Sequence, residues 1–246
     1  MYQFFVKPQQ IVGTTVYITG KDVNHIKNVL RMKPGEEVAV KTGTDEREYR
    51  CAIRALGEEQ IELELRFVKE DGLELPCRVF LFQGLPKSDK MEYIIQKAVE
   101  LGVYEIIPVR TRRAVVKLDE KKAQQKVNRW QGIAEAAAKQ SKRGIIPQIC
   151  DVMSFEQALS YAQDMQVKMI PYELAKGMGE TRALIAGIKP GESVAVFIGP
   201  EGGFDEAEIE AACACGIKPV SLGRRILRTE TAGMTVLAFL LYQMEE

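Results

Sequence analysis

The sequence has little histidine, no excess of charge of either sign and no apolar run long enough to cross a membrane. Its only histidine is His25, which excludes a histidine-rich metal site and argues against a histidine-based catalytic triad. The 34 basic and 34 acidic side chains cancel, so the net charge does not indicate a nucleic-acid partner. The most apolar segment, residues 231–244, is shorter than the roughly 20 residues of a membrane span and predicts a buried helix.

The five cysteines do not form the pattern of a disulfide framework, because their number is odd and most of them are widely spaced. Cys213 and Cys215 lie two apart, but no second pair or histidine cluster completes a zinc site. The chain does not open with a basic start and an apolar run, so we expect no signal peptide. These features predict a cytoplasmic protein without a metal and without a membrane partner.

Two regions with different hydrophobic periods divide the 246 residues. In the first, expected to be a domain of residues 1–72, a helix at residues 23–31 with Asp22 as its N-cap interrupts a series of short strands. These short segments predict a small β-barrel. The strands are expected at residues 14–18, 37–41, 49–54 and 60–67.

Strands and helices alternate in the second region, residues 73–246, which predicts an α/β domain whose parallel sheet is covered on both faces. A long helix is expected at residues 119–140, and Asp205 with Glu208 has the spacing of a capping box. Ser88 or Asp89 is expected to cap an earlier helix, and Asp89 with Glu92 also has the capping-box spacing. The strands are expected at residues 78–82, 103–109, 167–170, 193–198 and 220–222.

Charge is uneven along the chain although it sums to zero. Residues 110–143 include eleven Lys or Arg and three acidic residues. Such a run is often only a solvated helix face, but Arg110, Arg112 and Arg113 directly follow a predicted strand, where α/β proteins place ligand loops. The run therefore predicts contact with a phosphate backbone.

Three loops at predicted strand ends carry unusual sequences. GPEGGF follows the strand at 193–198, and its glycines allow close backbone approach to a ligand, although the spacing is neither that of a Walker loop nor GxGxxG. LGRRILRTETA covers residues 222–232, where Thr229 or Thr231 is a possible N-cap. QGLPKSDK covers residues 83–90. Each alone is typical of an ordinary turn, but together, on one edge of a sheet, they indicate a ligand site.

GPEGGF and LGRRILRTETA, with GLPKSDKMEYIIQKAVELGV and AAKQSKR, resemble the RsmE family over nearly the whole chain, and HIKNVLRMKPGEEV resembles that family's PUA-like domain. The resemblance implies a PUA-like β-barrel followed by a SPOUT α/β domain with a deep trefoil knot. It also implies a homodimer that uses S-adenosylmethionine to methylate N3 of a uridine in 16S ribosomal RNA of the small ribosomal subunit.

The resemblance also indicates the site. Arg228 is expected to stabilise a uracil anion and Glu230 to accept its proton, although Glu230 is equally suited to the positive end of the last helix. Glu201 is expected to face the sulfonium or to cap the following helix, and residues 171–173 to add a third wall. The residues expected to bind the cofactor are Ile198, Gly199, Pro200, Glu201, Gly202, Gly203, Leu222, Gly223, Ile226 and Leu227. Those expected to contact RNA are His25, Arg31, Lys87, Arg110, Arg112, Arg113, Arg143 and Arg225.

Two other functions stay open at this point. Another SPOUT enzyme would methylate a ribose 2′-oxygen, and a protein of the same fold without activity would bind RNA during ribosome assembly. The segment LGRRILRTETA favours the uridine-N3 family, and the intact cofactor loops favour an enzyme.

Overall fold

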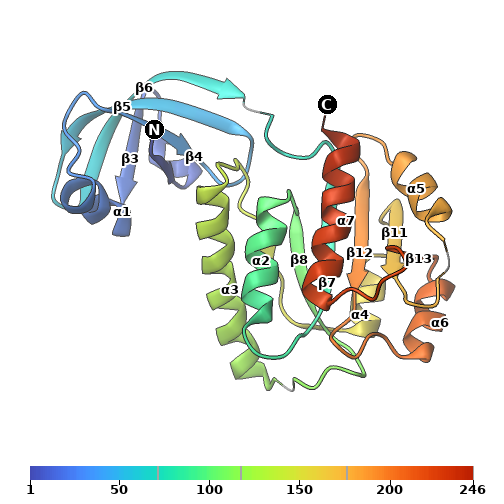
Figure 1. The fold of residues 1–246 in the computed structure, drawn as a ribbon. Coiled ribbons are helices and arrows are strands. Elements are labelled where there is room, and N and C mark those ends of the chain that lie inside the picture. Colours follow the sequence, from blue (N-terminus) through green and yellow to red (C-terminus); the bar gives the residue numbers. More distant parts are fainter. Residues whose placement is uncertain (71, 117, 176, 246) are drawn as a thin grey trace. The chain divides into compact units, whose positions relative to one another are not determined.

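The chain forms two compact units (Figure 1). The first combines Met1–Glu74 with Ala138–Ile146, and the second combines Leu75–Ala137 with Pro147–Glu246. Within the described part of the chain, no helix is long and apolar enough to cross a membrane. The computed structural model describes residues 1–70, 72–116, 118–175 and 177–245.

A six-stranded sheet with the order β1-β4-β5-β6-β3-β2 forms the first unit. β1 pairs with β4 in parallel, and the remaining neighbours in this order pair antiparallel. Each of the predicted strands overlaps an observed one, and their buried side chains, such as Val16 and Ile18, form one core. The elements are β1 (Gln3–Phe5), η1 (Pro8–Gln10), β2 (Ile11–Val12), β3 (Thr15–Thr19), α1 (Lys21–Asn24), η2 (His25–Val29), β4 (Glu37–Lys41), β5 (Arg47–Leu56) and β6 (Gln60–Glu70).

The helix between β3 and β4 begins earlier than the sequence predicts. α1 starts at Lys21 after an N-cap at Gly20, whose φ is 74°, and the π-helix η2 continues it. Asp22 is therefore not the cap. It lies in the first turn, where its carboxylate accepts hydrogen bonds of 3.1 and 3.2 Å from Lys139 Nζ.

Buried polar contacts hold Ala138–Ile146 to the rest of the first unit. The carboxylate of Glu74 accepts a 3.0 Å hydrogen bond from Arg143 Nε and 3.1 Å hydrogen bonds from the backbone N–H groups of Gly144 and Ile145. The side chain of Arg143 is only 4% exposed. A phosphate contact needs an accessible cation, so this burial contradicts the expectation that Arg143 contacts RNA.

Parallel strands joined through helices form the second unit, as predicted. The sheet has the order β10-β8-β7-β12-β11-β13, and β9 pairs with β8. The elements are β7 (Arg78–Gly84), α2 (Lys90–Glu100), β8 (Glu105–Arg110), α3 (Glu120–Gln140), β9 (Gln148–Ile149), β10 (Met153–Ser154), α4 (Phe155–Tyr161), β11 (Val167–Pro171), α5 (Gly179–Ala186), β12 (Ser193–Ile198), α6 (Glu206–Ala214), β13 (Lys218–Val220) and α7 (Thr229–Met244).

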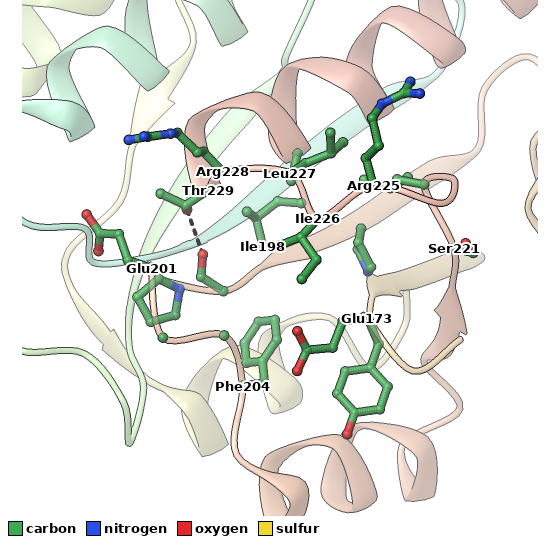
Figure 2. A pocket seen from close by; sticks show the side chains of 18 of the residues that line it. Glu173, Ile198, Glu201, Phe204, Ser221, Arg225, Ile226, Leu227, Arg228 and Thr229 are labelled. Atoms are coloured by element: carbon green, nitrogen blue, oxygen red, sulfur yellow. Dashed lines mark hydrogen bonds between the residues drawn. The ribbon is translucent and has the colours of Figure 1, made fainter. Parts of the chain in front are cut away.

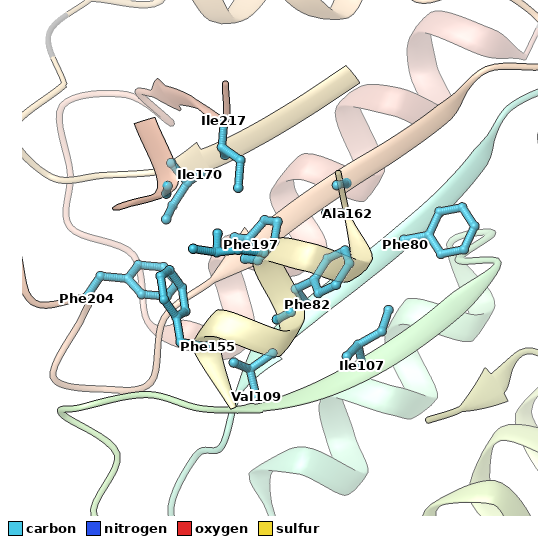
Figure 3. Close-up of a cluster of buried hydrophobic side chains, with 14 of the residues drawn as sticks. Phe80, Phe82, Ile107, Val109, Phe155, Ala162, Ile170, Phe197, Phe204 and Ile217 are labelled. Atoms are coloured by element: carbon cyan, nitrogen blue, oxygen red, sulfur yellow. The ribbon is translucent and has the colours of Figure 1, made fainter. Parts of the chain in front are cut away.

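Helices cover both faces of this sheet because its central strands are apolar on both sides. On one face Phe82 stacks on Phe197 with ring centroids 4.3 Å apart, within a cluster that includes Phe155 of α4 and Ile209 of α6 (Figure 3). Burying each such ring contributes about 1.5–3 kcal/mol. On the other face α7 packs on β12 and against α2, with Gly233 close to the sheet.

The structure confirms one predicted capping box, and at the other it confirms only the position of the N-cap. Asp205 has an extended backbone and accepts a hydrogen bond from Ala207 N, while the side chain of Glu208 accepts one from Asp205 N, which completes the capping box of α6. Asp89 precedes α2 with φ −91° and ψ 11° and makes no side-chain cap bond. Asp89 therefore occupies the predicted N-cap position, but its backbone is not extended and the side-chain bonds of the capping box do not form.

Candidate active site

A cavity of about 460 Å³ opens beyond the carboxyl ends of β11, β12 and β13 (Figure 2). Open parallel sheets bind ligands at this position, and small-molecule sites measure roughly 300–1,000 Å³. The loops after these three strands form its walls, and every residue expected to bind the cofactor lines it. The lining residues are Lys90, Pro171, Tyr172, Glu173, Ile198, Gly199, Pro200, Glu201, Gly202, Gly203, Phe204, Ser221, Leu222, Gly223, Arg224, Arg225, Ile226, Leu227, Arg228, Thr229 and Ala232.

The glycine-rich loop, residues 199–204, folds back on itself directly after β12. Gly203 N donates to Pro200 O at 2.9 Å, and the φ of Gly203 is 67°, which side-chain-bearing residues rarely adopt. A Cβ on Gly199 would lie 3.1 Å from the carbonyl carbon of Gly203. The glycines therefore let the turn close, and the wall there consists of backbone.

The loop after β8, which contains Arg112 and Arg113, packs against the glycine-rich loop. A Cβ on Gly202 would lie 3.2 Å from Arg113 Cβ, and Arg113 Nη1 donates to Gly202 O at 3.3 Å. Arg112 N donates to Glu208 Oε1 at 2.8 Å, which fixes the same loop to α6.

The loop between β13 and α7 forms another wall. β13 ends at Val220, two residues before the predicted end, so Leu222 lies in this loop. The buried hydroxyl of Thr181 in α5 holds the loop's start by donating to Ser221 O at 2.8 Å. Ile226 is 86% exposed, and Figure 2 shows it across the cavity from Phe204. Filling the cavity would remove this apolar side chain from water.

Glu201 extends toward the loop before α2. Its carboxylate accepts hydrogen bonds from Lys87 N at 3.1 Å and from Lys90 Nζ at 2.9 Å. Burial raises the pKa of Glu201, but the hydrogen bonds from Lys90 and from backbone N–H groups outweigh it and lower the pKa below its ordinary value. Because Asp205 caps α6, the helix-capping role for Glu201 is wrong.

Arg228 and Glu230 lie on either side of Thr229 at the start of α7. Arg228 lines the cavity, whereas Glu230 stands next to it, with Oε2 at 3.7 Å from Lys90 Nζ. Lys90 therefore lies between the carboxylates of Glu201 and Glu230. The three charged side chains form a network at one side of the cavity.

Neither predicted threonine caps α7, because the N-cap position is Arg228 and no side chain bonds there. The hydroxyl of Thr229 instead donates to Gly199 O at 2.6 Å and accepts from Gln83 Nε2 at 2.9 Å. Thr231 lies inside the helix, where its backbone oxygen accepts from the Thr235 hydroxyl.

The residues expected to contact RNA occur in both units. Arg225 lines the cavity, and Lys87 is exposed beside it. The side chains of Arg112 and Arg113 are 64% and 46% exposed and lie 3.4 and 3.6 Å from Asp205. Their charges are therefore accessible next to the glycine-rich loop.

The other expected RNA contacts differ in their surroundings. Arg110 is exposed at the end of β8, where its Nη2 donates to Leu118 O at 3.4 Å. His25 and Arg31 are exposed in the first unit, His25 at the start of η2 and Arg31 with an unusual φ of 53°.

Sequence reasoning gave no site role to several residues that line the cavity, among them Ser221 and Arg224. Lys90 lies in a quoted motif but was not assigned a role, and Phe204 and Ala232 line the cavity without having been named as cofactor contacts. Their positions at the ends of the motif loops were the available signal. Within the described residues, no three His, Cys, Asp or Glu side chains gather as a metal site.

Comparisons with known proteins identify the family of this chain. The family model described as an RNA methyltransferase domain matches residues 73–241, and the model described as an RNA methyltransferase PUA domain matches residues 18–66. The second unit is thus an RNA methyltransferase domain. The "Ribosomal RNA small subunit methyltransferase E" of Bacillus subtilis is 39% identical over 100% of this chain and 98% of its own length. The chain belongs to the ribosomal RNA small subunit methyltransferase E family.

Solved structures with similar sequences share the fold of this chain. A crystal structure described as a hypothetical protein is 39% identical, with a TM-score of 0.91 over 99% of this chain and 98% of that one. The ribosomal RNA small subunit methyltransferase E of Neisseria gonorrhoeae, solved bound to S-adenosyl methionine, is 32% identical, with a TM-score of 0.82 over 97% of this chain and 96% of that one.

Proposed function

We propose that this protein transfers a methyl group from S-adenosylmethionine to N3 of a uridine in 16S ribosomal RNA. Its relatives are named as small-subunit ribosomal RNA methyltransferases, and one was solved with S-adenosyl methionine. The observation that carries the proposal is the meeting of both C-terminal motif loops around one cavity, with Arg228 among its lining residues.

The residues around the cavity fit this cofactor. Ile198, Ile226 and Leu227 offer an apolar surface to an adenine ring, and the backbone of the glycine-rich loop offers hydrogen-bond donors and acceptors. Glu173 adds a carboxylate for hydroxyl or ammonium groups. When bound, S-adenosylmethionine supplies an electrophilic methyl group on a positively charged sulfur.

The protein's own residues then position the uridine and manage its proton. Methyl transfer is an in-line displacement, so much of the rate comes from orientation. Uracil N3 is a poor nucleophile until it loses its proton. We assign Glu230 to accept that proton, directly or through water, and Arg228 to stabilise the negative charge on the ring.

The proposal extends to RNA and to assembly. We assign phosphate contacts to Lys87, Arg110, Arg112, Arg113 and Arg225, and further RNA contacts to His25 and Arg31 in a domain of residues 1–72. We also propose a trefoil knot in the domain of residues 73–246, and a homodimer in which α7, with Tyr242 86% exposed, contributes to the interface. A substrate on the small ribosomal subunit would make the protein cytoplasmic.

Methylation of small ribosomal subunits that lack this modification tests the function. We expect the wild-type protein to produce 3-methyluridine, identified by nucleoside analysis, whereas a ribose-methylated product or no product contradicts the proposal. Arg228→Ala and Glu230→Gln should each lower the single-turnover rate by about a hundredfold with cofactor affinity kept. A normal rate in both variants would remove these residues from the catalytic site.

A further inference from the structure

A buried chain of hydrogen bonds joins three segments that are distant in the sequence. Gln83 Nε2 donates to Thr229 Oγ1 at 2.9 Å, and Thr229 Oγ1 donates to Gly199 O at 2.6 Å. Gln83 is 0% and Thr229 5% exposed. The chain therefore connects β7, the first residue of α7 and the first residue of the glycine-rich loop.

The direction of these hydrogen bonds is fixed by a neighbour. Gln83 Nε2 also donates to Gly84 O at 3.0 Å, and a carbonyl oxygen can only accept. The amide nitrogen of Gln83 must therefore face Gly84 and Thr229. The single hydrogen of the Thr229 hydroxyl is then left for Gly199 O.

The glutamine at this position leaves one buried oxygen unpaired while its nitrogen makes two hydrogen bonds. Among the described residues, Gln83 Oε1 is a buried oxygen with no hydrogen-bond partner. It belongs to a strand whose preceding residues, Phe80, Leu81 and Phe82, are apolar and buried. An unpaired buried acceptor destabilises a fold, and an apolar side chain of similar size would avoid that cost.

We propose that Gln83 and Thr229 are positioning residues for methyl transfer. Thr229 lies between Arg228 and Glu230, and its hydroxyl donates to Gly199 O, the first carbonyl of the glycine-rich loop. The hydrogen-bond chain therefore sets the distance from that loop to the side chains of Arg228 and Glu230. This inference rests on the proposed function. A displacement of about 1 Å in such a site lowers the rate by roughly a hundredfold.

Four variants separate this role from a structural one. Thr229→Val keeps the shape and removes the hydroxyl, Thr229→Ser keeps the hydroxyl, and Gln83→Met keeps the size and removes the amide. Thr235→Val is the matched control, because the Thr235 hydroxyl donates to Thr231 O at 2.8 Å within the same helix. Circular dichroism establishes that each variant is folded.

The first measurement is amide hydrogen exchange of residues 199–203 without cofactor, and the second is the single-turnover rate at saturating S-adenosylmethionine. In Thr229→Val and Gln83→Met we expect faster exchange and a rate lowered by about ten- to a hundredfold. Thr229→Ser and Thr235→Val should resemble the wild type in both.

Unchanged exchange, or a wild-type rate at saturating cofactor, in both Thr229→Val and Gln83→Met would overturn the proposal. A lower melting temperature with exchange and rate unchanged would do the same, since it would indicate a purely structural role. If the wild-type protein does not methylate ribosomal subunits, the proposed function fails, and hydrogen exchange still decides whether the chain fixes the loop.

Discussion

A side chain on Gly199 or Gly202 would meet the protein itself. The Cβ of the first would approach Gly203, and that of the second would lie 3.2 Å from Arg113 Cβ. A Cβ at either position would force its neighbour to shift by a few tenths of an ångström, so both glycines let the loop pack closely. The shape of the cavity depends on both contacts, whatever ligand the loop binds.

Gly202→Val should therefore abolish most S-adenosylmethionine binding while the protein stays folded. Overpacking of this kind costs about 1–3 kcal/mol, and where that cost displaces the loop from its binding conformation the affinity falls by about five- to 150-fold. Calorimetry measures the affinity, and Gly132→Ala in α3 is the control, because a Cβ there would have no neighbour within 4 Å. Unchanged affinity in Gly202→Val would contradict this account of the loop.

The Lys90–Glu201 pair should make part of the stability depend on pH. The pKa of Glu201 is lowered in the folded protein, so its contribution is present above the unfolded pKa and is lost as the pH falls through the folded pKa. The difference in melting temperature between wild type and Lys90→Met should thus be largest near neutral pH and shrink well below pH 4.5, the ordinary value for this carboxyl. Repeating the comparison in a Glu201→Gln background should remove most of that pH dependence; an equal difference at both pH values speaks against the pair.

The longer strands and helices were largely predictable because they carry a local pattern, whereas α4, α5 and the shortest strands were not predicted. The strands at 37–41 and 193–198 have the predicted bounds, and Asp205 caps α6 as its spacing indicates. The capping box predicted for Asp89 and Glu92 does not form, because the backbone of Asp89 is not extended and residue spacing does not encode this conformation. The ligand loops were located from the sequence, but the contacts that hold them, such as Gln83 to Thr229, depend on tertiary folding across 146 positions.

Asp205→Ala should lower the free energy of unfolding by about 1 kcal/mol, since it removes the N-cap of α6. The exposed ion pairs of Asp205 with Arg112 and Arg113 should add little to this loss. Chemical denaturation measures the change, and Glu206→Ala, at the exposed next position, is the control. Equal unfolding free energies for both variants would mean that the cap does not stabilise the helix.

Over the whole molecule the net charge is zero, but basic side chains are concentrated in residues 110–143. The arginines after β8 stand next to the glycine-rich loop, and burial of Arg143 removes one cation from the predicted set. Fewer basic side chains of residues 110–143 are therefore accessible to RNA than the sequence suggested. Phosphate binding should depend on the residues near the cavity more than on the run as a whole.

Arg112→Ala with Arg113→Ala should weaken binding to small-subunit RNA and flatten its salt dependence. Each phosphate contact on a single strand contributes about 0.7 to the slope of log affinity against log salt, so the slope should fall by roughly 1–2. Filter binding over a range of salt concentrations measures it. Replacing the exposed Lys189 and Lys218 by Ala removes the same charge elsewhere and should leave the slope closer to that of wild type; equal slopes for the two double variants would refute the assignment.

The first unit depends on residues that are synthesised late. The carboxylate of Glu74 accepts hydrogen bonds from Arg143, Gly144 and Ile145. The carboxylate of Asp22 accepts one from Lys139. Domains usually fold in the order in which they leave the ribosome, N-terminal first. Here the first unit can form these hydrogen bonds only after α3 and the segment that follows it have been translated. A nascent chain stalled before residue 138 would carry an unfinished first unit, however complete its sheet.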